Sequence, residues 1–268
     1  MEDSECIGFL QWASPRLGLR WAGFRRVHGQ VCKRLRRRLT ALGLIGLSAY
    51  RRLLETDAAE WEALDRLCRV SISRFYRDRG VWRHLEDELL PRLVAQALAR
   101  GADRLRLWSA GCASGEEPYT LALIFAFDRP SGIAGYEILA TDADPHLLER
   151  ARRGCYPRTS LRELPESWRV AFEASGDEHC LRPEYRTAVR FLEQDIRRGW
   201  PEGRFDLILC RNLVFTYFDA SLQAAIARRL AASLVPGGLL LLGSHECLPE
   251  GVPGLVRERP CLYRRVQA

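Results

Sequence analysis

The sequence predicts an α/β fold with a mostly parallel sheet, preceded by a small all-helical domain. From residue 104 onward, short apolar strands alternate with helices, which is the pattern of a parallel sheet with helices on both faces. Before that point only helical apolar spacing is seen, in residues 23–42, 48–54, 58–68 and 79–98. We therefore place a helical domain and linker in residues 1–78 and the sheet domain in residues 79–268.

Composition indicates a folded protein that does not insert into a membrane. Hydrophobic residues make up 47% of the 268 residues, enough for a buried core, yet no apolar run approaches the roughly 20 residues that span a bilayer. The N-terminus lacks the basic-then-apolar order of a signal peptide, so we expect a cytoplasmic protein. The nine cysteines show no CxxC pair or metal-ligand spacing. We interpret them as core thiols in a reducing compartment and expect neither a metal site nor disulfides.

The positive charge is concentrated in the helical domain. Residues 17–54 contain ten Lys or Arg and no Asp or Glu, whereas the whole chain has a net charge of only +7, so the remainder is net acidic. Apolar Val27, Val31, Leu35, Leu39 and Leu42 share one helical face, and the basic residues between 33 and 38 fall mostly on the others. This pattern fits an ordinary solvated face or a docking surface for an acidic partner, either a protein or a nucleic acid.

Within the sheet domain, six apolar segments read as strands. The last two are joined by a connection too short for a helical crossover, so we expect that pair to be antiparallel. Residues 156–190 break the alternation of strands and helices and look like an insertion with a short strand or two. The six segments are LRLWSAG, YEILATD, VRFLEQD, FDLILCRN, GGLLLLG and CLYRRV.

A small-residue turn follows the first strand, in LRLWSAGCASGEEPY at residues 105–119. Glycine allows sharp turns and close approach of a ligand, so the turn is a candidate cofactor loop. Ser114 with Glu117 predicts a capping box for the next helix. An ordinary strand-to-helix turn is the alternative interpretation.

Polar residues end the other strands. Asp142 follows the second strand, where a carboxylate can accept hydrogen bonds from ribose hydroxyls. Asp144 reads as a helix N-cap because Pro145 then takes the first helical position. Asp195 and Asn212 end two further strands. Because ligands bind at the carboxyl ends of parallel strands, these residues and the loop predict one rim, although a turn cap at Asp195 and a left-handed turn at Asn212 explain each residue equally well.

Five long motifs in order resemble the chemotaxis-receptor methyltransferase family of the CheR type. They are SISRFYRD, WSAGCASGEEPYTLAL, ILATDADPHLLERARRGCY, FDLILCRNLVFTYFD and LVPGGLLLLGSHE. The segment RRLTALGLIGLSAYRRLLE also resembles the helical N-terminal domain of that family. The resemblance implies a class I methyltransferase fold, Rossmann-like, and S-adenosylmethionine-dependent methylation of glutamate side chains on receptors, with S-adenosylhomocysteine as the product.

The resemblance also implies roles for particular residues. The loop would line the methionine part of the cofactor, Asp142 would bind the ribose, and Arg77 would reach over the active site with Tyr217 as the active-site tyrosine. Arg77 is implied to bind the cofactor as well, and the other implied cofactor residues are Ser71, Ser73, Gly111, Cys112, Ala113, Gly115, Glu116, Glu117, Asp195, Ile196, Asn212 and Leu213.

The sequence departs from the family at three places. Ser71 and Ser73 stand where the family usually has Asn or Thr, and CRNLVFTYF has one extra residue before Tyr217. The segment that would form the receptor-tethering β-subdomain, around residues 172–190, is short. These differences bear on the acceptor more than on the cofactor.

The expected reaction is an in-line displacement by a carboxylate, which is ionised near pH 7 and needs no general base. The basic helical domain would then recognise an acidic protein, such as the cytoplasmic region of a chemoreceptor. Methylation of a nucleic acid or a small molecule is an alternative, although the chain lacks a DPPY-like motif. A non-catalytic S-adenosylmethionine-binding interaction protein is the other alternative.

Overall fold

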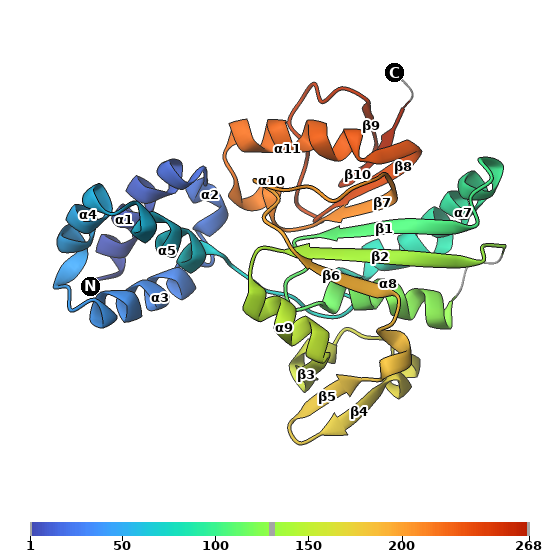
Figure 1. Ribbon diagram of the computed structural model, residues 1–268, viewed down its shortest axis with the longest axis horizontal. Helices are drawn as coiled ribbons and strands as arrows, with labels where there is room; N and C mark the ends of the chain where they lie inside the picture. The colour runs from blue at the N-terminus through green and yellow to red at the C-terminus, as the bar shows by residue number, and fades with distance from the viewer. Residues whose placement is uncertain (1, 129–131, 267–268) are drawn as a thin grey trace. The chain divides into compact units, whose positions relative to one another are not determined.

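The structure is a computed structural model that describes residues 2–128 and 132–266. These residues divide into two compact units (Figure 1). One unit holds the chain up to Ser71 together with Thr216–Gln223, and the other holds Ile72–Phe215 and the chain from Ala224 onward. The segment 216–223 therefore groups with the helical residues.

The first unit is helical. The basic helix α3 buries Val31, Leu35 and Leu39 on one face, as its apolar spacing predicts, while Lys33 and Arg37 are exposed. The predicted helix at residues 23–42 is in fact two helices, because the chain leaves helical geometry at residues 25–27. The elements are α1 (Asp3–Ala13), the 3-10 turn η1 (Ser14–Leu17), α2 (Trp21–Phe24), α3 (His28–Ala41), α4 (Gly46–Thr56) and α5 (Ala58–Cys68).

Helix α1 was not predicted, and a disulfide joins it to α3. Cys6 and Cys32 are both buried and are bonded to each other. A second disulfide, Cys155–Cys180, lies in the other unit. The expectation that the chain contains no disulfides is therefore wrong for four of the nine cysteines. It failed because each pair is 25 or 26 residues apart in sequence, and only the fold brings the partners together.

The segment 216–223 is held against the start of the helical unit. Leu19 and Phe218 form an isolated antiparallel bridge, and the backbone N–H of Arg20 donates to the carbonyl of Tyr217 over 2.8 Å. The ring of Tyr217 packs on Phe24 with 5.2 Å between ring centroids. A Cβ added to Gly23 would approach the carbonyl oxygen of Thr216 to 2.3 Å, so this close contact requires glycine.

The second unit is built on a seven-stranded sheet in the order β6-β2-β1-β7-β8-β10-β9 (Figure 1). Strands β6, β2, β1, β7 and β8 are parallel, and β10 is antiparallel to β8, which confirms the predicted sheet and its antiparallel last pair. The additional edge strand β9 was not predicted. The strands are β1 (Arg104–Ala110), β2 (Gly135–Asp142), β6 (Val189–Glu193), β7 (Phe205–Cys210), β8 (Leu234–Leu242), β9 (Leu255–Arg259) and β10 (Leu262–Arg265).

Helices pack against the sheet, and α8 among them is almost wholly buried. Helix α7 contacts β1 and β7, while α8 and α9 contact β2 and β6. Every residue of β7 is buried, as expected for a central strand of a parallel sheet. The helices after α5 are α6 (Arg79–His84), the π-helical turn η2 (Leu85–Leu89), α7 (Leu90–Ala99), α8 (Glu116–Phe127), α9 (Pro145–Arg153), α10 (Val214–Tyr217) and α11 (Ala220–Ala232), and the segment 216–223 of the first unit includes the end of α10 and the start of α11.

The insertion forms a small sheet of its own in the order β3-β5-β4. Its strands are antiparallel, and Cys155 lies directly opposite Cys180 in the β3–β5 pair. The insertion is thus more regular than the predicted strand or two. It comprises β3 (Cys155–Pro157), η3 (Arg158–Leu161), η4 (Glu166–Ala171), β4 (Phe172–Ser175), β5 (Glu178–Leu181) and η5 (Pro183–Tyr185).

Candidate active site

Four neighbouring strands end at one edge of the sheet and carry the residues that the sequence singled out. Asp195 lies two residues after β6, Asp142 ends β2, Gly111 follows β1, and Asn212 lies two residues after β7. These strands are consecutive in the sheet order, so the structure brings the four segments together. The carboxyl edge of a parallel sheet is where open α/β folds bind their ligands.

The loop after β1 is fixed by backbone hydrogen bonds to the end of β2. The N–H groups of Gly111 and Cys112 donate to the carbonyl of Thr141 over 2.8 and 2.9 Å, and the N–H of Ala113 donates to Asp142 Oδ2 over 2.8 Å. Gly111 has φ +80°, and a Cβ there would approach Leu213 Cδ2 to 2.4 Å. The loop therefore needs glycine at this turn, and it packs against the segment after β7.

The predicted capping box of helix α8 is wrong. Gly115, with φ +93°, is the N-cap, and it provides no side-chain bond. Ser114 Oγ instead donates to Glu116 Oε2 over 2.9 Å. Glu117 points to other partners, because Ser109 Oγ donates to its Oε1 over 2.7 Å. The SxxE pattern misled because the helix begins one residue later than a serine cap requires.

Asp142 is half-buried and organises two backbone segments. Besides Ala113, it accepts a hydrogen bond from the N–H of Asp144 through Oδ1 over 3.0 Å. Asp144 in turn accepts from the N–H of His146 over 2.9 Å, which confirms Asp144 as the N-cap of α9 with Pro145 at the first position. A carboxylate oxygen can accept more than one hydrogen bond, so Asp142 retains the chemistry that ribose hydroxyls require.

Asp195 is bound to its own turn. It accepts from the backbone N–H of Arg197 over 2.9 Å and forms an ion pair with the Arg197 guanidinium at 2.6 Å. The adjacent Ile196 is buried. The N–H of Gln194 donates to the Asp142 carbonyl over 2.9 Å, which ties this turn to the end of β2. The turn-cap interpretation of Asp195 is thus confirmed, and its position beside Asp142 also leaves it on the rim.

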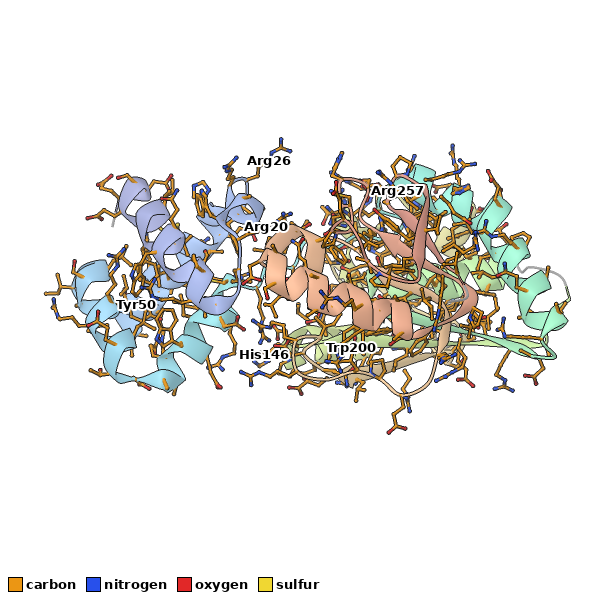
Figure 2. The ribbon with its side chains drawn as sticks, turned by 90° about the horizontal axis from the view of Figure 1, so that it is seen from above. Arg20, Arg26, Tyr50, His146, Trp200 and Arg257 are labelled. Atoms are coloured by element: carbon orange, nitrogen blue, oxygen red, sulfur yellow. A yellow bond between two sulfur atoms is a disulfide. The ribbon has the colours of Figure 1, made fainter. Side chains whose placement is uncertain are left out.

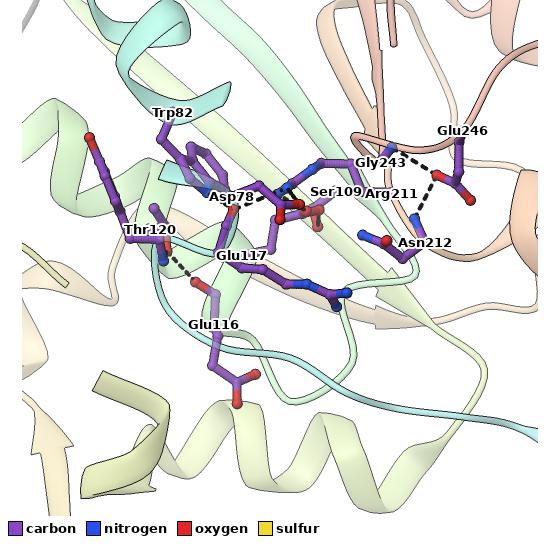
Figure 3. Close-up of polar contacts among 12 residues, drawn as sticks. Asp78, Trp82, Ser109, Glu116, Glu117, Thr120, Arg211, Asn212, Gly243 and Glu246 are labelled. Carbon is purple, nitrogen blue, oxygen red and sulfur yellow. Dashed lines mark hydrogen bonds and ion pairs between the residues drawn. The ribbon is translucent and has the colours of Figure 1, made fainter. Parts of the chain in front are cut away.

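A buried arginine that the sequence reading missed links three parts of the site (Figure 3). Only 3% of the Arg211 side chain is exposed, and it forms ion pairs with Asp78 at 2.7 Å and with Glu117 at 3.2 Å. Burial raises the pKa of the Glu117 carboxyl above its ordinary value, and Arg211 and Ser109 oppose that rise. A signal was present in the sequence, because Arg211 is a charged residue directly after the fully buried strand FDLILC.

A second carboxylate holds the ends of β7 and β8 together. Glu246 is buried, and its Oε2 accepts the N–H groups of Asn212 and Gly243, each over 2.7 Å (Figure 3). Asn212 has φ +55°, which confirms the left-handed turn that the sequence allowed. Leu213 then packs on Gly111, so Asn212 and Leu213 border the loop.

The two residues expected to act on the acceptor belong to different units. Arg77 lies in the second unit, two residues before α6, and its Nη1 donates to the carbonyl of Ile72 over 2.7 Å. Tyr217 belongs to the helical unit, and its catalytic role stays a prediction from the resemblance. Ser71 is exposed at the end of the helical unit and Ser73 is half-buried in the following extended segment.

The described residues contain neither a cluster of metal ligands nor a helix that could cross a membrane. Among residues 2–128 and 132–266, no three His, Cys, Asp or Glu side chains are grouped so as to hold a metal ion. Within the same ranges, no helix has the length and apolar character needed to cross a membrane.

Residues 71–261 match the protein family described as CheR methyltransferase, SAM binding domain. This match covers more than half of the chain and includes the loop, Asp142, Asp195 and Arg211. The chain belongs to the CheR methyltransferase family. It is therefore an S-adenosylmethionine-dependent methyltransferase with a class I, Rossmann-like fold. The resemblance of the five motifs to this family is confirmed.

Relatives named chemotaxis protein methyltransferase are similar to this protein over most of the chain. The chemotaxis protein methyltransferase of Listeria monocytogenes is 41% identical over 194 residues, covering 72% of this chain and 71% of that protein. The enzyme of the same name from Salmonella typhimurium is 33% identical over 267 residues, covering 96% and 87%. That from Escherichia coli is 32% identical over 255 residues, covering 92% and 85%.

The residues at the strand ends fit S-adenosylmethionine, which presents ribose hydroxyls as well as cationic sulfonium and ammonium groups. Asp142 ends β2 and accepts the N–H of Ala113 from the loop, so its carboxylate lies where ribose hydroxyls can donate to it, and Glu117 lies in the first turn of α8 next to the loop. Bound there, the cofactor supplies a methyl group that is activated toward nucleophiles.

Proposed function

We propose that this protein methylates glutamate side chains in the cytoplasmic region of a chemoreceptor-like protein. The observation that carries the proposal is the match to relatives named chemotaxis protein methyltransferase over as much as 96% of the chain. The chemistry of the site agrees with it. A glutamate is already ionised near neutral pH, so positioning replaces proton transfer as the main requirement.

We propose that different residues of the site bind the cofactor and the acceptor. Asp142 would bind the ribose hydroxyls, the 111–115 loop would border the methionine part, and Asp195 with Ile196 would border the adenine. Arg77 would bind the acceptor carboxylate, since a guanidinium offers two parallel donors that match its two oxygens. Water must also be kept away from the reacting atoms. The apolar side chain of Leu213, which packs on Gly111 of the loop, would help to exclude it.

The nature of the methylated group is tested by its lability to base. The full-length protein is incubated with tritiated S-adenosylmethionine and a purified chemoreceptor cytoplasmic fragment. We expect the label to leave the fragment as volatile methanol in mild alkali, because a carboxyl methyl ester hydrolyses there and a methylated amine does not. A fragment whose labelled glutamates are changed to alanine is the matched control. Alkali-stable label, or label on added transfer RNA instead, would contradict glutamate methylation.

We further propose that α3 recognises the acidic acceptor. Lys33 and Arg37 are exposed and lie one helical turn apart, so both project from one side of the helix. By contrast, Arg34 and Arg38 are bound internally, Arg34 to the carbonyls of Leu67 and Arg69 and Arg38 to Glu60. Complementary charge chiefly speeds association and selects the partner.

Charge reversal on α3 should therefore raise KM for the acceptor. We expect Lys33→Glu with Arg37→Glu to raise it by about tenfold at low salt, with little change in kcat, because exposed charges act on encounter and are screened by salt. The control is Arg204→Glu with Arg228→Glu, which changes the net charge equally at exposed positions of the second unit. An equal rise in both double variants would mean that only net charge matters and would remove α3 as the recognition surface.

A further inference from the structure

The main chain around Arg77 is held in an unusual conformation. Tyr76 and Asp78, on either side of it, have φ of +56° and +65°. Non-glycine residues rarely adopt this left-handed region, and such conformations persist only where the surroundings impose them. The N–H of Tyr76 donates to Thr120 Oγ1 over 3.1 Å, which attaches this segment to helix α8.

Two buried donors converge on the carbonyl oxygen of Arg77. Arg211 Nη2 donates to it over 3.1 Å and Trp82 Nε1 donates to it over 2.8 Å. The same Nη2 atom also bonds Asp78 Oδ2 over 2.7 Å, so one guanidinium nitrogen holds residues 77 and 78 together. The Trp82 ring lies 5.2 Å from the Arg211 guanidinium carbon, in the range of a cation–π contact.

The opposite side of Arg211 is fixed to the cofactor side of the site. Its Nη1 binds Glu117, which lies in the first turn of helix α8 and is itself held by Ser109 on β1 (Figure 3). Arg211 follows β7, so its guanidinium connects the ends of two adjacent strands to the Arg77 segment. With 3% of its side chain exposed, Arg211 is enclosed by these groups.

We propose that Arg211 and Trp82 are positioning residues for methyl transfer, which fix the main chain of Arg77 so that its guanidinium meets the acceptor carboxylate in register with the cofactor loop. The proposal rests on the proposed function of Arg77. It adds that turnover depends on two buried groups that act on the acceptor only through Arg77. Small displacements of a group that orients a substrate are costly in rate, which makes such rigidity useful.

A double-mutant cycle with Arg77→Ala tests this proposal. Trp82→Phe removes the indole donor and keeps an aromatic ring under Arg211, and Asp78→Asn removes a charge but keeps the size and the tolerance of a left-handed φ. We expect each to lower kcat by about threefold to tenfold in the wild-type background, with the cofactor Kd within about twofold. In the Arg77→Ala background neither should lower kcat further, because the group that they orient is gone.

Trp61→Phe is the matched control, since its indole also donates to a main-chain carbonyl, that of Leu54, over 2.7 Å. It should lower thermal stability without changing kcat. Equal losses from Trp82→Phe in both backgrounds would mean a role independent of Arg77 and would overturn the proposal, as would unchanged kcat in folded Trp82→Phe and Asp78→Asn. Normal turnover by Arg77→Ala itself would instead refute the role of Arg77, and the positioning role would fall with it.

Discussion

Replacing Arg77 with alanine is expected to remove most turnover while leaving cofactor affinity within a few-fold. A hydrogen bond to a charged group contributes about 1.5–3 kcal/mol, and each 1.4 kcal/mol in the barrier is about tenfold in rate. We therefore expect kcat to fall by roughly 10- to 100-fold. The measurement is the initial rate of methyl transfer at saturating cofactor and acceptor, with cofactor Kd from titration calorimetry.

Two variants make this result specific. Arg79→Ala removes an exposed arginine two residues away that donates to the carbonyl of Glu163 over 3.1 Å, and it should leave kcat near wild type. Asp142→Ala, unlike Arg77→Ala, should act mainly on cofactor binding. It should weaken cofactor binding by about 1–3 kcal/mol, since it removes the proposed ribose acceptor and the anchor of Ala113. Normal turnover in folded Arg77→Ala would refute its role at the acceptor.

Asp142 and Arg77 differ in how well their positions could be predicted from the sequence. Asp142 ends a buried strand, so its position was predictable from the alternation of strands and helices alone. Arg77 lies in an irregular segment between α5 and α6 that turns at residues 75–76, and the pattern of apolar residues gives no information about where such a segment runs. Only the resemblance pointed to Arg77. The structure adds the left-handed residues on both sides and the two donors to its carbonyl.

Features that depend on long-range contact escaped the sequence analysis. Ser114 and Glu117 have capping-box spacing, yet Ser109 on β1 and Arg211 just after β7 bind Glu117, and Gly115 is the cap. Likewise the cysteines were interpreted from spacing, whereas Cys6 meets Cys32 because α1 packs beside α3. Local propensity fixes elements well, but a side chain with several compatible partners is assigned by tertiary packing.

The largest stability effect is expected in the helical unit, at the buried carboxylate of Glu60. Glu60 is 4% exposed, and Arg38 binds it through two nitrogens over 2.5 and 3.0 Å. The hydroxyl of Tyr50, which lies inside this unit in Figure 2, donates to it over 2.5 Å. Arg38 on α3 and Glu60 on α5 thus join two helices of this unit.

Arg38→Met should cost about 2–4 kcal/mol of unfolding free energy at pH 7. Removing one member of a buried pair leaves an uncompensated charge and typically costs about 3–5 kcal/mol, and we lower that range because the Arg38 side chain is 36% exposed, so water can reach the site. Glu60→Gln should cost less, since the Arg38 left behind is partly hydrated and Tyr50 keeps an acceptor. The readouts are denaturant unfolding of the full chain and hydrogen exchange of amides in α3 and α5.

The pH dependence separates this electrostatic cause from lost packing. The hydrogen bond from Arg38 is the largest cause that lowers the pKa of Glu60 in the folded protein. Its stabilisation is therefore present above the unfolded-state pKa of about 4.3 and is lost only as pH falls through the lower folded-state value. In Arg38→Met the buried carboxyl has lost this cation, so burial should raise its pKa instead. The ionised Glu60 then destabilises the variant at pH 7, and this destabilisation is lost once Glu60 is protonated. The stability difference between wild type and variant should shrink as pH falls from 7 toward 4.5, whereas a constant difference would assign the loss to the packing of the Arg38 methylenes.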